Sequence, residues 1–244
     1  MNFMKNNIIS HSGICPICEK EVVFSSKENW FRDHLLCSSC GSIPRERALM
    51  KVISEFYPSW RDFEIHESSP GGRGASVKLH SECRAYTASQ FFPNISLGHI
   101  HPQSGYRCEN IEKLTFPDNS FDLFITQDVM EHIFNPEAAF REIARVLKPG
   151  GAHIFTVPLI NKTRKSERWA SYDEDGKTIY HNPPEYHGNP IDQAGSLVTM
   201  HWGYDIVAFI LKNAQMPSLI IAIDDMNFGI RAEYIEVLVS TKAE

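Results

Sequence analysis

Four cysteines near the start of the chain place the strongest constraint on its fold. Cys15 and Cys18 form one C-x-x-C pair, and Cys37 and Cys40 form a second pair 18 residues further on. This spacing is typical of a tetrahedral zinc site, in which two tight turns present four thiolates to one ion. A module of about 35 residues buries too little apolar surface to fold alone, so the metal would supply its folding free energy. We therefore predict a structural Zn²⁺ ion bound by these four cysteines, with no position left for water.

The spacing alone leaves two other uses of these thiols open. They could stay reduced and take part in redox chemistry, or they could bind an iron–sulfur cluster. Disulfides are rare in the cytosol, where paired C-x-x-C motifs are more often metal ligands. Cys83 and Cys108 stand alone in the sequence, and we expect them to be ordinary core or surface residues.

The charge balance argues against sequence-independent electrostatic binding of nucleic acid. The chain of 244 residues has 24 basic and 30 acidic side chains, which gives a net charge of −6, whereas such binding needs a basic face. No apolar run is long enough to span a membrane, and the first residues lack the apolar segment of a signal peptide. We expect a cytoplasmic protein whose partner is a small molecule, and we predict no oligomeric state.

After the cysteines, strands and helices alternate along the chain. Apolar spacing predicts a helix over 45–57, and Asn135 followed by Pro136 predicts the start of another. Phe121–Thr126 is nearly continuously apolar, as expected for a strand inside a parallel sheet. Further strands are expected at 63–66, 84–88, 107–109, 152–157, 218–223 and 234–240, and further helices up to residue 82 and over 203–213.

This alternation predicts a doubly wound α/β domain. We assign residues 1–44 to a tail and the four-cysteine module, and residues 45–244 to the α/β domain. Residues 159–200 are polar and rich in Pro, Gly, His and Tyr. We interpret them as an insertion with little regular structure that covers a substrate.

A glycine-rich turn follows the first strand of this domain, in the segment Ser69-Pro70-Gly71-Gly72-Arg73-Gly74. A cofactor with an adenosyl group needs such a turn, because residues without large side chains let the backbone approach the ligand. The spacing is not G-x-G-x-x-G, so it does not indicate a dinucleotide site, and a plain strand–helix turn is the alternative.

Residues 114–158 contain several short motifs in a fixed order. They are the LxFPDxSFD approach to a strand, a DVxEH turn, the REIxRVLKPGG helix and a strand that ends in VP. In this order they closely resemble the class I S-adenosylmethionine-dependent methyltransferases of the type 11 kind. Residues 43–49 (IPRERAL) are similar to a bacterial subgroup that joins a zinc module to such a domain. The resemblance covers most of the chain and is weak over 75–107 and 159–200.

The resemblance implies a Rossmann-like, seven-stranded methyltransferase sheet with helices on both faces and one antiparallel strand near the end. It also implies S-adenosyl-L-methionine across the carboxyl ends of the strands. Carried over by position, the cofactor-binding residues are Glu67, Ser68, Ser69, Pro70, Gly71, Gly72, Ser89, Gln90, Asn110, Ile111, Gln127, Asp128, Val129 and His132. The chain departs from the family at two places: it lacks the usual acidic residue after the second strand, so that Ser89 or Gln90 would have to serve, and Ser69 stands where a first glycine is common.

Two histidines are candidates for proton transfer. In the fold that the resemblance implies, the segment after the fifth strand normally covers the methyl acceptor, and His187 lies in this segment. An imidazole titrates near neutral pH, so His187 is our first candidate for a general base and His132 the second. A solvated loop histidine is the alternative for His187, and a helix-capping role is the alternative for His132.

The expected function is methyl transfer from S-adenosylmethionine to a polar small molecule, such as a sugar or glycan precursor. One alternative is a methyltransferase that acts on RNA or protein docked by the zinc module. Another is a non-catalytic binding or scaffold protein with a degenerate cofactor site. A nicotinamide-dependent dehydrogenase fits poorly, because the dinucleotide spacing and the acidic residue after the second strand are both missing.

Overall fold

The computed structural model describes residues 8–188 and 193–243. A seven-stranded sheet in the order β15-β16-β8-β7-β4-β5-β6 forms its centre. The strands are β4 (Glu64–Ser68), β5 (Ala85–Gln90), β6 (Arg107–Cys108), β7 (Phe121–Gln127), β8 (Leu147–Thr156), β15 (Ser218–Ile221) and β16 (Val237–Thr241). Strands β4 to β8 pair in parallel, while β16 is antiparallel to both of its neighbours. This confirms the predicted Rossmann-like methyltransferase sheet with one antiparallel strand near the end.

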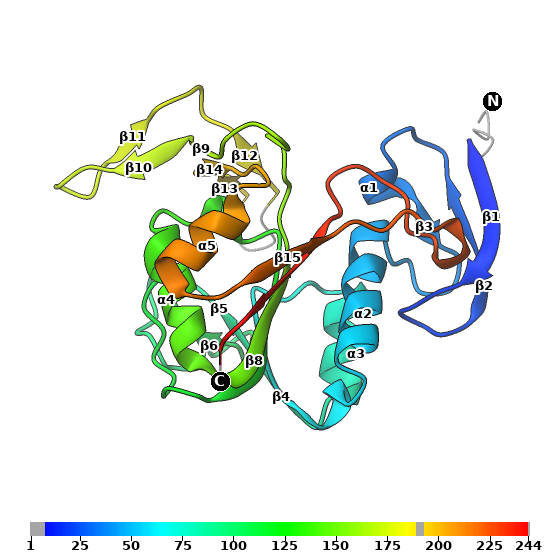
Figure 1. Ribbon diagram of the computed structural model, residues 1–244, viewed down its shortest axis with the longest axis horizontal. Helices are drawn as coiled ribbons and strands as arrows, with labels where there is room; N and C mark the ends of the chain where they lie inside the picture. Colours follow the sequence, from blue (N-terminus) through cyan, green and yellow to red (C-terminus); the bar gives the residue numbers. More distant parts are fainter. Residues whose placement is uncertain (1–7, 189–192, 244) are drawn as a thin grey trace.

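Two pairs of helices cover the two faces of this sheet (Figure 1). Helices α2 (Pro44–Phe56) and α3 (Gly74–Glu82) pack on one face, and α4 (Pro136–Val146) and α5 (Ile206–Ala214) pack on the other. Helix α4 starts as predicted, because the Asn135 side chain accepts a hydrogen bond from the backbone N–H of Ala138. No helix in the described part of the chain is long and apolar enough to cross a membrane.

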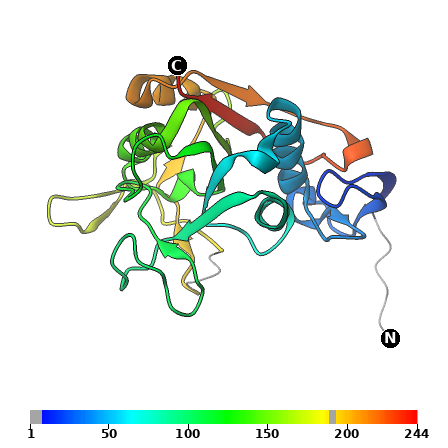
Figure 2. The ribbon, with the colours of Figure 1, turned by 90° about the horizontal axis from the view of Figure 1, so that it is seen from below.

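The N-terminal residues form a small antiparallel sheet instead of a loose tail. It contains β1 (Ile9–Ile14), β2 (Glu21–Ser26) and β3 (Leu36–Cys37), and the short helix α1 (Phe31–His34) precedes β3. Strand β1 is ordered by pairing with β2 along its whole length, whereas residues 1–7 of the predicted tail lie outside the described residues. The sheet agrees with a zinc-ribbon-like module, and it lies at one end of the molecule, opposite the hairpin of β10 (Ala170–Tyr172) and β11 (Thr178–Tyr180) (Figures 1 and 2).

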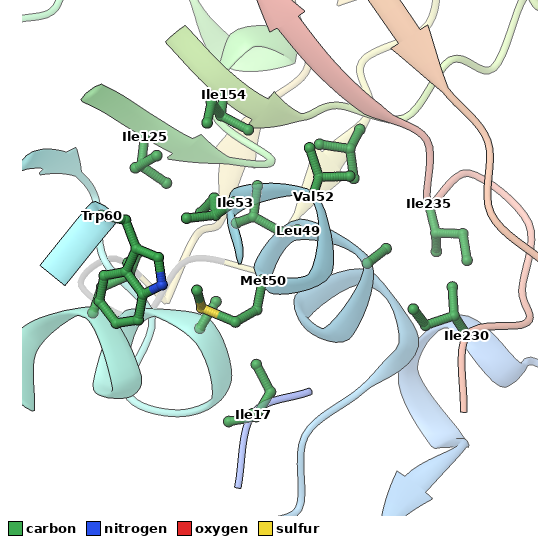
Figure 3. Close-up of a cluster of buried hydrophobic side chains, with 14 of the residues drawn as sticks. Ile17, Leu49, Met50, Val52, Ile53, Trp60, Ile125, Ile154, Ile230 and Ile235 are labelled. Atoms are coloured by element: carbon green, nitrogen blue, oxygen red, sulfur yellow. The ribbon is translucent and has the colours of Figure 1, made fainter. Parts of the chain in front are cut away.

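Helix α2 links this module to the large sheet through one continuous apolar core. Leu49 and Ile53 face the sheet residues Ile125 and Ile154, while Ile17 of the module packs on the other side of the helix (Figure 3). All five side chains are almost fully buried. The module therefore shares its core with the α/β domain, as expected for a segment too small to form one of its own.

The expectation of little regular structure over 159–200 is wrong in part. Besides β10 and β11, this insertion contains β9 (Glu167–Arg168), β12 (Tyr186–His187), β13 (Ser196–Leu197) and β14 (Met200–His201). They pair as β10–β11, β12–β13 and β9–β14, all antiparallel. Strands of two or three residues are too short to give the alternating pattern by which strands are predicted. Residues 189–192 of the insertion lie outside the described residues.

A buried arginine holds the module, α2 and the C-terminal segment together. Arg47 is fully buried, and its guanidinium donates to the backbone carbonyls of Ser42, Leu35 (2.8 Å) and Gly229 (2.6 Å). It also lies 4.7 Å from the centre of the Phe24 ring. Burial lowers the pKa of Arg47 to about 10, so the side chain is still charged at neutral pH. A charged group in such a place is tolerable only because its donors are satisfied.

Replacing Arg47 is therefore expected to destabilise the whole chain. The Arg47→Met variant keeps the length of the side chain but leaves three buried carbonyls without their donor. We expect the free energy of unfolding of the zinc-loaded protein to fall by about 3 kcal/mol or more, as measured by urea denaturation. The matched control is Arg84→Met, because the Arg84 side chain is 83% exposed and pairs only with the exposed Asp62 among the described residues. It should change stability by less than about 1 kcal/mol, and equal effects of the two substitutions would refute the role given to Arg47.

Candidate functional site

A cavity of about 840 Å³ opens at the carboxyl ends of the central strands. Its floor is formed by residues at or just after the ends of four strands: Ser69–Gly71 at β4, Gln90 and Phe91 at β5, Gln127–Val129 at β7, and Pro158 at β8. Ligands of open α/β sheets gather at this edge. The volume lies within the range of about 300–1,000 Å³ that is usual for small-molecule sites.

The glycine-rich turn leaves open space at the end of β4. Ser69 adopts a left-handed backbone conformation (φ 58°), and its N–H donates to the carbonyl of Ser89 at 2.8 Å. The N–H of Gly71 donates to the Ser76 hydroxyl at the start of α3 (2.9 Å). A Cβ on Gly71 would meet Ser76 Oγ only at 3.5 Å, and one on Gly72 would meet nothing within 4 Å. The turn therefore needs no glycine at these two positions for its own packing, and the free space is available to a ligand.

Glu67 supports this turn from below, because its carboxylate is fully buried and does not line the cavity. It accepts hydrogen bonds from Ser76 (2.7 Å), Tyr86 (2.7 Å) and Gln127 (2.8 Å). Burial raises the pKa of Glu67, and these hydrogen bonds oppose that rise. Glu67 thus ties β4, β5, β7 and α3 together beneath the turn.

Several other residues predicted to hold the cofactor also lie away from the cavity wall. Ser68 and Ser89 are buried, and the Ser89 hydroxyl hydrogen-bonds with His66 at 3.0 Å. Asn110 accepts a hydrogen bond from the N–H of Glu112 in its own turn (2.9 Å), and Ile111 packs into the core beside α4. Among the predicted residues, Ser69, Pro70, Gly71, Gln90, Gln127, Asp128, Val129, His132 and His187 line the cavity.

Asp128 is held between two arginines of the N-terminal segment. Its carboxylate pairs with Arg32 at 2.6 Å and with Arg45 at 3.1 Å, and it accepts a hydrogen bond from Thr156 at 3.2 Å. Burial opposes its ionisation, but the two guanidinium groups outweigh this effect and hold the pKa of Asp128 below its usual value. Sequence reasoning gave neither arginine a role at this site: Arg32 lies far from the methyltransferase motifs, and the IPRERAL segment that contains Arg45 indicated only the join between the module and the domain.

The other end of the cavity is formed by the insertion and the turn after β7. His132 ends the 3₁₀ turn η2 (Met130–His132), and His187 lies on β12. Their rings meet edge to face, with 5.1 Å between the centres. Glu131 lies between them, and its Oε1 is 3.7 Å from a ring nitrogen of each histidine. Sequence reasoning had given Glu131 no separate role at this site.

Aromatic side chains from two distant segments complete the wall. Trp30 of the N-terminal module and Tyr234, just before β16, line the cavity, with 6.3 Å between their ring centres. Arg32 binds the backbone carbonyl of Tyr234 through its Nε (3.1 Å). The N-terminal module, the insertion and the C-terminal segment therefore all contribute to one cavity, whose wall is partly aromatic and partly charged.

The four N-terminal cysteines meet at one point, outside this cavity. The Sγ atoms of Cys15 and Cys40 are 3.7 Å apart, and those of Cys18 and Cys37 are 3.9 Å apart. All four lie within 4.8 Å of one another. Four thiolates around Zn²⁺ at about 2.3 Å form a tetrahedron with edges of about 3.8 Å, so the two distances fit that ion. Cys83 and Cys108 are buried elsewhere, where each thiol faces backbone carbonyls.

Comparisons with known proteins agree on the central part of the chain. Residues 76–155 match the family model described as a methyltransferase domain, Methyltransf_11. An uncharacterised methyltransferase of Schizosaccharomyces pombe is 50% identical over 46 residues, which are 19% of this chain and 16% of that protein. A ubiquinone biosynthesis O-methyltransferase of Parvibaculum lavamentivorans is 32% identical over 65 residues, 27% of this chain and 25% of that one. A phosphoethanolamine N-methyltransferase of Triticum aestivum is 33% identical over 81 residues, 33% of this chain and 16% of that one.

These matches therefore span at most a quarter of the length of the three relatives. Among solved structures, a Haloferax volcanii protein described as a methyltransferase, in complex with the Trm112 methyltransferase activator, is similar in fold. It has a TM-score of 0.50 and 15% identity, over 82% of this chain and 90% of that one. The matched domain, the order of the sheet and the relatives agree with one another: residues 76–155 match a methyltransferase domain, and the sheet around them has the fold of S-adenosylmethionine-dependent methyltransferases.

Proposed function

We propose that this chain transfers a methyl group from S-adenosylmethionine to a polar small molecule. The observation that carries the proposal is the single cavity at the carboxyl ends of the strands. One end is a glycine-rich turn with free space above it, and the other end is lined by His132, His187 and Glu131. A methyl donor and an acceptor that share this cavity would meet between the two ends.

The residues at the first end suit the donor. The proposed contacts are Ser69–Gly71 at the turn, Gln90 at the end of β5, and Gln127, Asp128 and Val129 at the end of β7. Glu67, Ser68, Ser89, Asn110 and Ile111 would act from behind this wall, by holding the turn and the strand ends in place. Gly72 is exposed beside the turn and would leave room for the cofactor. When bound, S-adenosylmethionine supplies a methyl group on a positively charged sulfur, which a nucleophilic atom of the acceptor displaces.

The residues at the second end suit a polar acceptor. Trp30 and Tyr234 offer aromatic faces, and the histidines and charged groups beside them offer hydrogen bonds. A sugar or glycan precursor has hydroxyl groups and apolar ring faces that match such a wall. The neighbouring Glu131 carboxylate raises the pKa of His187, and in its neutral form this ring would accept the proton of an attacking hydroxyl.

Binding of the cofactor provides the first test. We expect S-adenosylmethionine and S-adenosylhomocysteine to bind with micromolar dissociation constants in calorimetry, whereas NAD should not bind. Gly71→Val places a branched side chain at the cavity wall where the protein itself leaves room, so the variant should fold but bind at least tenfold more weakly. Its matched control is Ser81→Val in α3, where Ser81 bonds only a backbone carbonyl one turn earlier among the described residues. A folded wild-type protein that binds neither compound would refute the proposal and favour a scaffold.

We also propose that Cys15, Cys18, Cys37 and Cys40 hold a structural Zn²⁺ ion. The support is the distance match given above, because four thiolates complete the tetrahedral shell of a structural zinc ion. Four thiolates and one Zn²⁺ carry a net charge of −2, which would stabilise the buried Arg47 beside them. Burial, the largest effect, raises the pKa of the Cys15 thiol to about 12, so a nearby cation is needed to hold it as a thiolate.

Cobalt substitution tests this metal site. Protein loaded with one equivalent of Co²⁺ should show the thiolate-to-cobalt charge-transfer absorption of a tetrahedral four-sulfur site, and Zn²⁺ should abolish it. Cys37→Ser should weaken this absorption and lower the melting temperature, because metal binding contributes to folding. The control is Cys83→Ser, which alters a buried cysteine away from the cluster and should leave the spectrum unchanged. A spectrum without thiolate bands would exclude these ligands.

We further propose that the N-terminal cysteine module helps to shape the cavity, through the ion pair of Arg32 with Asp128. Both side chains are largely covered, at 11% and 19% exposure. An ion pair in such a place is stronger than one on the surface, and either charge left alone would be costly. The module would thus fix the wall of the cavity around Asp128.

A double-mutant cycle measures this coupling. We expect Arg32→Met and Asp128→Asn to show an interaction energy of about 1–3 kcal/mol in urea unfolding, because the two groups share one partly buried contact. The control cycle is Arg84→Met with Asp62→Asn, a pair at 2.8 Å whose side chains are 83% and 60% exposed. Its coupling should stay below about 1 kcal/mol. Additive effects of Arg32→Met and Asp128→Asn would show that the contact does not tie the module to the site.

A further inference from the structure

A second cluster of possible metal ligands lies at the cavity and contains no cysteine. It consists of Glu131, His132 and His187. One carboxylate oxygen and one nitrogen from each ring lie within 4.8 Å of one another. Glu131 Oε1 is 3.7 Å from His132 Nε2 and 3.7 Å from His187 Nδ1. Donors at about 2.1 Å from a tetrahedral ion lie about 3.4 Å apart, so small side-chain shifts would bring all three onto one ion. All three residues line the cavity, which provides a path of entry.

The Glu131 carboxylate is buried and accepts no hydrogen bond from the described residues. Its side chain is 2% exposed, and neither of its oxygens has a hydrogen-bond partner in the described part of the chain. A buried carboxylate without partners is strongly destabilising, because it loses its hydration and gains nothing in exchange. A positive group beside this carboxylate would satisfy it, and His187 on β12 and His132 are the side chains that face it.

In both histidines, the ring nitrogen that points away from Glu131 has a hydrogen-bond partner. The nitrogen that faces Glu131 is therefore available to a metal ion. His132 Nδ1 faces the backbone carbonyl of Leu197 at 2.9 Å, so it must carry the proton of the neutral ring. His187 Nε2 likewise faces Glu185 Oε1 at 3.2 Å, and the other oxygen of Glu185 contacts His201 at 2.9 Å. The unprotonated nitrogens then point their lone pairs toward Glu131. Hydrogen bonds of this kind behind the ring orient the histidine ligands of metal sites.

From these observations we propose that Glu131, His132 and His187 bind a divalent transition-metal ion at the acceptor end of the cavity. Two imidazoles and one carboxylate are typical ligands of Zn²⁺, Fe²⁺, Mn²⁺ or Co²⁺, while Ca²⁺ and Mg²⁺ prefer oxygen ligands. Three protein ligands leave positions open toward the cavity for water or for an acceptor oxygen. Such an ion would lower the pKa of a bound hydroxyl and fix its position.

The use of this ion rests on the proposed function, but its binding does not. With the ion bound, His187 would be a ligand and could not accept a proton. An acceptor hydroxyl bound to the ion would then release its proton to water. The two roles of His187 are therefore alternatives, and a measurement of metal binding separates them.

The test is a titration of zinc-loaded protein with Co²⁺, followed by calorimetry and by absorption. The cysteine site is then already filled by the tighter-binding ion. We expect one further Co²⁺ per chain, with weak d–d bands and without thiolate charge-transfer absorption. Glu131→Gln and His187→Gln should each weaken this binding at least tenfold, and Glu185→Gln should weaken it by about 10–100-fold, through the orientation of His187.

The matched control is His181→Gln, because His181 lies in the same insertion and hydrogen-bonds only with exposed Ser171 and the backbone of Trp169 among the described residues. It should bind Co²⁺ as the wild type does. No Co²⁺ binding beyond the cysteine site, or binding that His187→Gln and Glu131→Gln leave unchanged, overturns the proposal and leaves His187 as the ionic partner of Glu131. S-adenosylhomocysteine binding is measured on the same wild-type sample, so a failure of the proposed methyl transfer is seen separately.

Discussion

The contact of Asp128 with Arg32 and Arg45 joins segments that lie about a hundred residues apart in the sequence. Asp128 directly follows the central strand β7 in a left-handed backbone conformation (φ 53°) and lines the cavity. Arg32 comes from the short helix of the cysteine module, and Arg45 comes from the first turn of α2. Because the carboxylate is held by both, the module, the helix and the strand end keep one arrangement. The shape of the cavity depends on it, since Arg32, Arg45 and Asp128 all line its wall.

The segment Arg45-Glu46-Arg47 at the start of α2 places three charged residues in three different environments. Arg45 points to Asp128, and Arg47 points into the core between the module and the C-terminal segment. Glu46 caps its own helix through the N–H of Ile43 and binds Arg73 at 3.0 Å beside the glycine-rich turn. Gly74 has a left-handed backbone (φ +60°), and a Cβ there would collide with the Glu46 side chain, so a larger residue would strain the backbone and displace Glu46. One turn of helix therefore positions the module, the turn after β4 and the end of β7.

The sequence was sufficient to predict the long elements, because their burial follows a regular period. The sheet, α2 and the capped start of α4 are found where apolar spacing placed them. It was not sufficient for the direction of single side chains at the strand ends. Glu67 follows the family pattern in position, yet its carboxylate is taken up by Ser76, Tyr86 and Gln127. Similarly, Asn110 closes its own turn. Arg32 and Arg45 could not be foreseen, since contacts between distant segments leave no trace in local periodicity.

The insertion illustrates the same limit at the acceptor end. Its strands are too short to predict, but hydrogen bonds from the insertion and from Trp202, just after it, fix it on the turn after β7. The N–H of Thr199 donates to the Glu131 carbonyl at 2.8 Å, the indole of Trp202 donates to the Met130 carbonyl at 3.1 Å, and His132 bonds the Leu197 carbonyl at 2.9 Å. Backbone carbonyls are present whatever the residue, so no motif marks these contacts.

The floor and the walls of the cavity come from different parts of the chain. The floor consists of turns that directly follow the parallel strands, which the fold itself requires. The walls come from the cysteine module, the insertion and the segment before β16, which the fold does not require. Loops attached to a rigid scaffold can change without disturbing the sheet. Under the proposed function, the acceptor would therefore meet Trp30, Tyr234 and His187 on these walls, next to Glu131 and His132 in the turn after β7, and the other strand ends would hold the cofactor.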